Sequence, residues 1–166
     1  GLPAGTTVVG VFDVHSVYLG KADGTPQVVP DGFPMIVLTE DGTPGITFLS
    51  GSTAPTELRI ALLKKGSGPE VLADSVVTVA YSGWLWPTDS SAPVNQFDSS
   101  WTKGTPATFD LAGGVISGFA KALVGQRVGS QVEVIIPPSE GYGDKDNGPI
   151  PAGSTLVFVI DILGVN

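Results

Sequence analysis

The stretch that decides the fold is residues 132–163, which read VEVIIPPSEGYGDKDNGPIPAGSTLVFVIDIL. Two apolar runs, 132–136 and 156–163, are typical of strands, and they flank a long loop rich in glycine and proline. Tyr142 and Ile150 are the conspicuous apolar side chains of that loop. Loops of this length are uncommon inside a compact domain and often carry function, so we expect this one to do so.

Working outward, the sequence predicts further strands and a single helix. The expected strands cover residues 58–63, 76–86, 107–111, 127–136 and 155–163. One segment has a helical period, with a single apolar stripe and a glycine stop at Gly125: Ile116, Phe119, Ala120 and Leu123. A lone short helix among antiparallel strands indicates an α+β fold, in which the sheet wraps around the helix. A helix that short is marginal in water, so its apolar face must pack.

Upstream of residue 56 the chain reads as a β-rich N-terminal extension. Residues 35–38 and 46–49 flank a turn-forming stretch at 41–45 and predict a hairpin. A cluster of Ser, Thr, Gly and Pro at 50–56 reads as a linker. We therefore expect three parts: 1–17, an extension and linker over 18–55, and the main domain over 56–166.

The first of these parts repeats the last strand of the main domain. Residues 2–17 align without gaps on residues 150–165, with eight of sixteen positions identical. Either two similar strands arose by coincidence, or residues 1–17 are the last strand of a preceding, related domain; we favour the second interpretation. A strand without its sheet has unpaired backbone groups, so residues 5–17 are expected to pair with this sheet or with another molecule.

Composition excludes several functions. The 166 residues are 42% hydrophobic and 14% charged, with a net charge of −8 at pH 7, so a packed core is expected and a nucleic-acid partner is not. No run is long enough for a membrane helix. Abundant Thr, Ser, Gly and Val with few lysines indicate a secreted or cell-surface protein, with a cytoplasmic location left open.

The usual catalytic motifs are missing from the sequence. There is no cysteine, and His15 is the only histidine, expected to be an ordinary strand residue. A catalytic triad and a thiolate or multi-histidine metal site are thereby excluded from the main domain, and no metal or cofactor is expected. Gly141-Tyr142-Gly143 lacks the rest of a phosphate-loop pattern. Asp144 and Asp146 are interpreted as solvated loop charges, with a calcium site as the weaker alternative.

Several motifs in order and at matching spacing give residues 56–166 a family resemblance. They are VTVAYSG at 77–83, FDSS at 97–100, VISGF at 115–119, VG at 128–129, IPP at 136–138, YG at 142–143, IP at 150–151 and LVF at 156–158. Together they resemble the FKBP-type peptidyl-prolyl cis/trans isomerases. The resemblance implies an FKBP-like fold and a pocket for proline-containing polypeptides.

The resemblance also implies roles for particular residues. Four would act on the substrate, namely Tyr81, Asp98, the Ile116 backbone N–H and the Tyr142 hydroxyl. The pocket would be walled by Phe97, Val115, Ile150 and Phe158, with Phe119 as its floor. Phe119 replaces the tryptophan that is most frequent in the family. Ala107 replaces an aromatic residue and should open one side of the pocket. Lys103 replaces an arginine, and since Lys and Arg are not equivalent at a carboxylate, the ion pair to Asp98 is left open.

Two hypotheses follow from the resemblance. The first is an isomerase of X-Pro bonds that stabilises a twisted amide in an apolar pocket and binds tacrolimus- or rapamycin-like macrolides. The second is a non-catalytic peptide-binding or chaperone module with a degenerate pocket, suggested by Phe119, Lys103 and Ala107. The repeated strand and the Ser/Thr/Gly-rich texture also resemble tandem FKBP proteins exported by bacteria.

Overall fold

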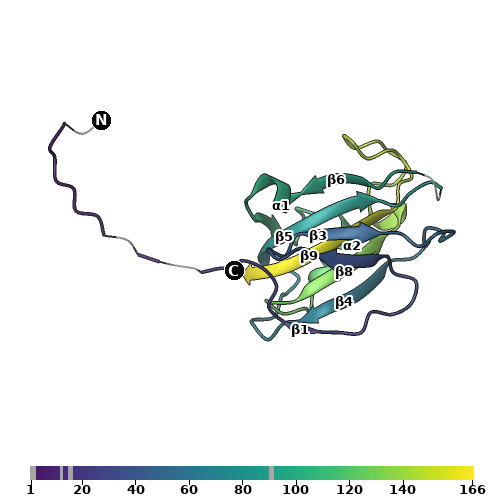
Figure 1. The fold of residues 1–166 in the computed structure, drawn as a ribbon, viewed down its shortest axis with the longest axis horizontal. Coiled ribbons are helices and arrows are strands. Elements are labelled where there is room, and N and C mark those ends of the chain that lie inside the picture. Colours follow the sequence, from purple (N-terminus) through teal and green to yellow (C-terminus); the bar gives the residue numbers. More distant parts are fainter. Residues whose placement is uncertain (1–2, 12, 15–16, 90–91) are drawn as a thin grey trace.

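The fold is built on a seven-stranded antiparallel sheet (Figure 1). The computed structural model describes residues 3–11, 13–14, 17–89 and 92–166. The strand order is β1-β4-β8-β9-β5-β6, and β7 also pairs with β5. The sheet strands are β1 (Thr25–Pro26), β4 (Arg59–Lys65), β5 (Val76–Leu85), β6 (Asn95–Ser99), β7 (Ala107–Asp110), β8 (Gln131–Ile136) and β9 (Leu156–Val165). The two longest strands, β5 and β9, lie side by side at its centre.

The predicted helix is α2 (Ser117–Leu123), which lies against the inner face of the sheet. Phe119, Ala122 and Leu123 are its buried side chains, so the apolar stripe is centred slightly differently from the expected one. Gly118 lets α2 approach β8, because a Cβ there would lie only 2.6 Å from Ile136 Cγ2. Two shorter turns complete the helical content: α1 (Ser100–Lys103) and the 3₁₀ turn η1 (Pro138–Glu140).

The main core lies between α2 and the inner face. Alternate residues of β9 face it, including Leu156, Phe158, Ile160 and Ile162, all of them buried. This follows from the period of two in a strand, which sends successive side chains to opposite faces. Residues 156–163 are nevertheless apolar on both faces, and the other face is buried as well.

The N-terminal extension covers that other, outer face. The hairpin β2 (Met35–Leu38) and β3 (Pro44–Thr47) lies across the sheet, in front of it in Figure 1, with α2 behind. A second buried cluster forms there from Phe33, Ala61, Trp86, Ile135 and Val157, with Ile46 and Phe48 against it. β1 adds an edge strand to β4. The residues predicted as extension and linker therefore pack on the main domain.

Polar contacts also attach the extension to the sheet. Asp161 on β9 accepts from the Ala22 backbone N–H at 2.7 Å and from Gln131 Nε2 at 2.6 Å. Arg59 donates to the carbonyls of Asp31 and Gly32, and its guanidinium stacks on the Phe33 ring at 4.6 Å. These contacts fix the extension at two separate points of the outer face.

One carboxyl group on the outer face has no partner. Glu133 on β8 is fully buried, and neither of its carboxyl oxygens has a hydrogen-bond partner among the described residues. Burial raises the pKa of Glu133 to about 8. Its carboxyl is therefore protonated at neutral pH, which avoids the far larger cost of a buried charge.

The structure confirms the α+β fold class, with an antiparallel sheet and a short packed helix. Strand β6 was missed, because its residues Asn95–Ser99 lie partly in a stretch that reads as a polar turn. The described residues of 3–17 form no strand in this sheet, and His15 lies outside the described residues. No helix in the described part of the chain is long and apolar enough to cross a membrane.

Candidate functional site

Tyr81 and Asp98 form a hydrogen-bonded pair at the mouth of the inner core. Tyr81 lies in the middle of β5, and its hydroxyl donates to Asp98 Oδ2 on the neighbouring strand β6 at 2.5 Å. The pairing of β5 and β6 shifts register between Gly83 and Trp84, so that Phe97 is skipped in the ladder. A bulge changes the direction of the side chains beside it. Here it allows Asp98 to contact Tyr81 and its neighbour Phe97 to contact Phe158.

The Asp98 carboxylate is held by three donors. Besides Tyr81, Lys103 Nζ donates to Oδ1 at 2.5 Å and the Ser99 backbone N–H donates to Oδ1 at 2.8 Å. Burial raises the pKa of Asp98, but the hydrogen bonds from Lys103 and Tyr81 outweigh it and hold the pKa below its ordinary value. Burial, reinforced by the bond to Asp98, raises the pKa of Tyr81. The pair is thus a carboxylate and a neutral phenol.

Lys103 settles the question that the sequence left open. It lies at the end of α1, five residues after Asp98, and forms the ion pair in spite of replacing an arginine. The Lys103 side chain is 61% exposed, so the pair is a surface contact of modest strength. A lysine supplies the charge at a single point, whereas an arginine would add a second parallel hydrogen bond.

Aromatic rings pack together beside this pair, on the inner face of the sheet. Phe158 lies 5.4 Å from both Phe97 and Phe119, edge to face in each case, and Tyr81 lies 6.2 and 6.3 Å from Phe158 and Phe119. Such edge-to-face pairs are favourable and fix the ring planes. Gly83 makes the packing possible, because a Cβ there would come within 2.7 Å of both the Phe97 and Phe158 rings.

The remaining predicted residues come from the start of α2 and from the long loop. Val115 and Ile116 are half-buried against the inner core, and Ile150 is buried in it. Ile116 caps α2, and its backbone N–H has no hydrogen bond to any described residue. Tyr142, in the long loop, is 37% exposed. The structure thus brings five of the nine residues together, namely Tyr81, Asp98, Phe97, Phe119 and Phe158. Val115, Ile116 and Ile150 pack on the same core, and their roles and that of Tyr142 stay predictions.

Two supporting residues were not assigned to the site from sequence. Phe109 on β7 packs 5.7 Å from Tyr81 and 5.4 Å from Phe119, so it extends the aromatic cluster. The alternation of Ala107 and Phe109 along a half-buried strand was the available signal. Ser100 accepts from the Tyr81 backbone N–H at 2.8 Å and fixes α1 against β5; the FDSS motif contains it, but no role was predicted for it.

Ala107 and the acidic loop residues have simple structural settings. Ala107 is half-buried beside the inner core and pairs with Val79. Asp146 accepts from the Ala152 backbone N–H at 2.8 Å, so it holds the loop around Ile150. Within the described residues, no three His, Cys, Asp or Glu side chains are grouped as a metal site.

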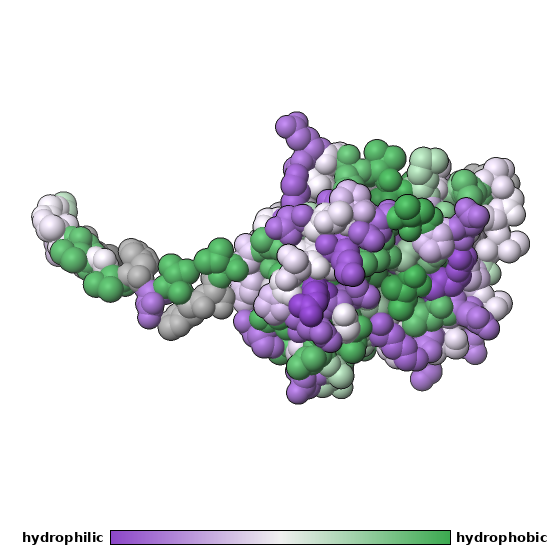
Figure 2. Space-filling model, turned by 90° about the horizontal axis from the view of Figure 1, so that it is seen from below, coloured by the Kyte–Doolittle hydropathy of each residue, from purple (hydrophilic) through white to green (hydrophobic). Residues whose placement is uncertain are grey.

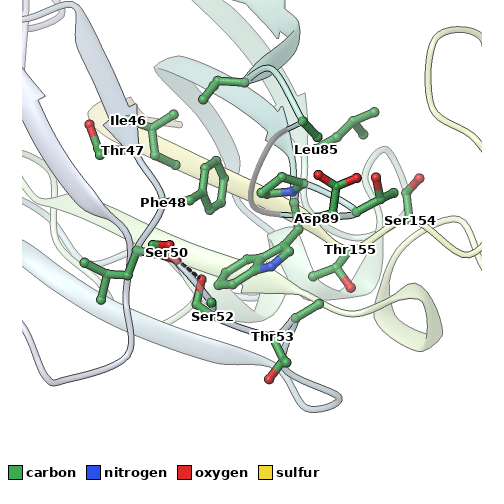
Figure 3. Close-up of a pocket in the computed structure, with 18 of the residues that line it drawn as sticks. Ile46, Thr47, Phe48, Ser50, Ser52, Thr53, Leu85, Asp89, Ser154 and Thr155 are labelled. Carbon is green, nitrogen blue, oxygen red and sulfur yellow. Dashed lines mark hydrogen bonds between the residues drawn. The ribbon is translucent and has the colours of Figure 1, made fainter.

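A separate cavity of about 580 Å³ contains none of these nine residues (Figure 3). It lies between residues 46–54 of the extension, the loop 85–94 and residues 151–155. Phe48 and Trp86 stack edge to face at 5.1 Å in its wall, and the Trp86 indole nitrogen has no hydrogen-bond partner in the described part of the chain. The candidate site is the aromatic cluster around Tyr81 and Asp98, called the aromatic pocket below, because a fixed carboxylate and a phenol lie together there.

Comparison with known proteins agrees with this geometry. Residues 68–163 match the family model described as FKBP-type peptidyl-prolyl cis-trans isomerase. An FK506-binding protein of Streptomyces anulatus is 40% identical over 118 residues, which are 69% of this chain and 91% of that protein. A probable FK506-binding protein of Corynebacterium glutamicum is 36% identical over 110 residues, 66% of this chain and 88% of that one.

Solved structures show the same fold. The crystal structure of FkpA from Escherichia coli matches with a TM-score of 0.59 and 28% identity, over 79% of this chain and 51% of that one. AtFKBP13 matches with a TM-score of 0.57 and 28% identity, over 69% of this chain and 98% of that one. The chain thus spans about half the length of FkpA. It belongs to the FKBP-type peptidyl-prolyl cis/trans isomerases.

Proposed function

We propose that the aromatic pocket isomerises X-Pro bonds in extended or unfolded polypeptides and also binds tacrolimus- or rapamycin-like macrolides. The observation that carries this proposal is the Tyr81–Asp98 pair, which lies against a cluster of aromatic rings. Proline is compact and apolar, so it suits a pocket floored by Phe119 and walled by Phe97 and Phe158.

Rotation about an X-Pro bond can be accelerated by the shape and polarity of a pocket alone. Rotation about an X-Pro bond crosses a barrier of about 18–20 kcal/mol because it breaks amide resonance. A twisted amide has lost that resonance, so its carbonyl is less polar than that of the planar form. An apolar pocket therefore disfavours the planar amide relative to the twisted one, which lowers the barrier.

Hydrogen-bond donors at the rim position the substrate. The Ile116 N–H and the Tyr142 hydroxyl would donate to substrate carbonyls on either side of the proline. Asp98, held ionised by Lys103 and Tyr81, would face the bound amide and favour the rearranged dipole of its twisted form. Fixed groups of this kind stabilise a transition state without reorganising.

The test is isomerisation of a short X-Pro peptide, followed by protease coupling with and without a macrolide. We expect macrolide-sensitive acceleration, a 10-fold or greater loss in Asp98→Asn, and a smaller loss in Tyr142→Phe. Matched controls are Asp110→Asn and Tyr18→Phe, which make the same two substitutions outside the pocket. Peptide binding without acceleration would instead support the non-catalytic module, and equal losses in the controls would contradict the assignment of the pocket.

A further inference from the structure

Residues 3–17 carry a run of exposed valines outside the body of the domain (Figures 1 and 2). Val9 and Val11 are 88% and 95% exposed, and no described residue of the segment pairs with the sheet. Exposed apolar side chains in a row are an aggregation hazard that proteins normally cover. Because residues 2–17 repeat residues 150–165, the surroundings of β9 indicate which kind of surface would cover this segment.

Three identities within the repeated strand fall on one face. In β9, side chains alternate, so that Phe158 and Ile160 face the inner core while Val157 belongs to the outer cluster. The identical outer-face pairs are Val9 with Val157, Val11 with Val159, and Asp13 with Asp161. The segment therefore repeats the face that the N-terminal extension covers in this domain.

Asp13 is the most specific member of the repeat. Its counterpart Asp161 is buried, and it accepts from the Ala22 backbone N–H of the extension at 2.7 Å and from Gln131 on β8 at 2.6 Å. An aspartate in the middle of an apolar strand is costly to bury unless such donors are present. Asp13 thus fits a sheet that has both a β8-like neighbour and its own covering extension.

The inner-face positions differ in one informative way. Gly10 stands where this domain has Phe158, whose ring contacts Phe97 and Phe119. A sheet closed by residues 6–17 would keep its apolar inner face at Val8 and Val14 but lack one aromatic wall of the pocket. The partner is therefore a domain of this fold with an incomplete pocket.

The structure also places the end of this strand against β9. Directly after residue 17, the Leu19 N–H donates to the Leu163 carbonyl at 3.1 Å, and Asn166 Nδ2 donates to the Tyr18 hydroxyl at 2.9 Å. A cavity of about 390 Å³ adjoins this point, and its lining includes Val17, Tyr18, Pro69, Val128, Val165 and Asn166. Val17, Tyr18 and Leu19 thus lie at this end of β9, so a partner of the residues before Val17 would lie at this end as well.

We propose that residues 4–17 are the closing strand of a second domain of the same fold, which precedes this domain in a longer polypeptide and abuts the end of β9. The inference does not depend on the isomerase activity. The partner sheet would receive the strand between its β8-like and β5-like strands, as β9 lies between β8 and β5 here.

The first test has two parts. One determines the coding sequence upstream of Gly1, and the other measures amide hydrogen exchange in the longer protein. Counterparts of the 77–83, 97–100 and 115–119 motifs should precede Pro3 in the order and spacing in which these motifs precede Pro151. Amides of residues 6–11 should exchange freely in the 166-residue protein and at least ~1,000-fold more slowly in the longer one. An upstream sequence without those motifs, or unchanged exchange, would overturn the proposal.

A substitution separates the proposed partner from a second copy of this chain. Val11→Asp should leave the melting temperature of the 166-residue protein unchanged. In the longer protein it should lower one unfolding transition and remove the protection of residues 6–17. Val28→Asp is the matched control, since Val28 is equally exposed. A 166-residue protein that dimerises through this segment, and becomes monomeric as Val11→Asp, would contradict the proposal.

Discussion

Both faces of the sheet are buried, but different parts of the chain cover them. The inner face packs α2 against rings of Tyr81, Phe97, Phe119 and Phe158 and leaves polar groups available at its mouth. The outer face is closed by the extension around Phe33 and Trp86, and its Asp161 is satisfied within the protein. Two buried groups of the outer face, Glu133 and the Trp86 indole nitrogen, lack a hydrogen-bond partner among the described residues. We nevertheless expect the substrate to meet the inner face, because the Tyr81–Asp98 pair lies there, and the outer face to serve stability.

The largest expected effect tests this division with two phenylalanines. Phe33→Ala on the outer face and Phe119→Ala on the inner face should each lower the free energy of unfolding by about 3–5 kcal/mol, because both rings are buried. Only Phe119→Ala should also lower the isomerisation rate of a short X-Pro peptide, by at least ~10-fold, when both proteins are assayed well below their melting temperatures. Equal losses of activity would show that the faces are coupled.

A smaller effect concerns Glu133 on the outer face. In the unfolded chain this group loses its proton near its ordinary pKa of 4.5, whereas the folded protein keeps it until about pH 8. Stability from this group is therefore complete below pH 4.5 and falls as pH rises toward 8, by about 4–5 kcal/mol in total.

The measurement is urea unfolding of the wild type and Glu133→Gln between pH 5 and 8. The amide has the same shape and cannot ionise, so the difference between the two proteins should change with pH in the direction just stated. A constant difference would mean that Glu133 is ionised in the folded protein. The isomerisation rate of the variant should match that of the wild type.

The smallest effect concerns Lys103 beside the inner pocket. Because this ion pair is largely exposed, Lys103→Met should change the free energy of unfolding by less than about 1 kcal/mol. It should also raise the pKa of Asp98, so that the rate falls at a higher pH on the acidic side of its pH profile. Lys103→Arg should preserve the pH profile. If the pH profile of Lys103→Met is also unchanged, the isomerisation rate does not depend on the charge of Asp98.

The sequence was sufficient for the inner face and insufficient for the outer one. Alternation in 76–86, the apolar run at 156–163 and the helical stripe placed the centre of the sheet and α2, although β6 was missed. The pocket residues came from the spacing of the family motifs. The cover by the extension was not foreseen, because a hairpin at 35–47 has no local signal of where it docks. The double-sided apolar pattern of 156–163 was the available sign that both faces of β9 are buried. Lys103 and Ser100 depend on the conformation of α1, which sequence patterns did not predict.

The position of β9 has a consequence for the order in which this domain can be made. β9 lies between β8 and β5 and pairs with both along most of its length, yet it is the last strand of the sheet to be synthesised. Until residues 156–165 leave the ribosome, β5 and β8 have no partner between them and the inner core lacks four of its buried side chains. The nascent chain therefore stays unfolded until β9 has been synthesised. We expect this domain to fold only after that point and not strand by strand during translation.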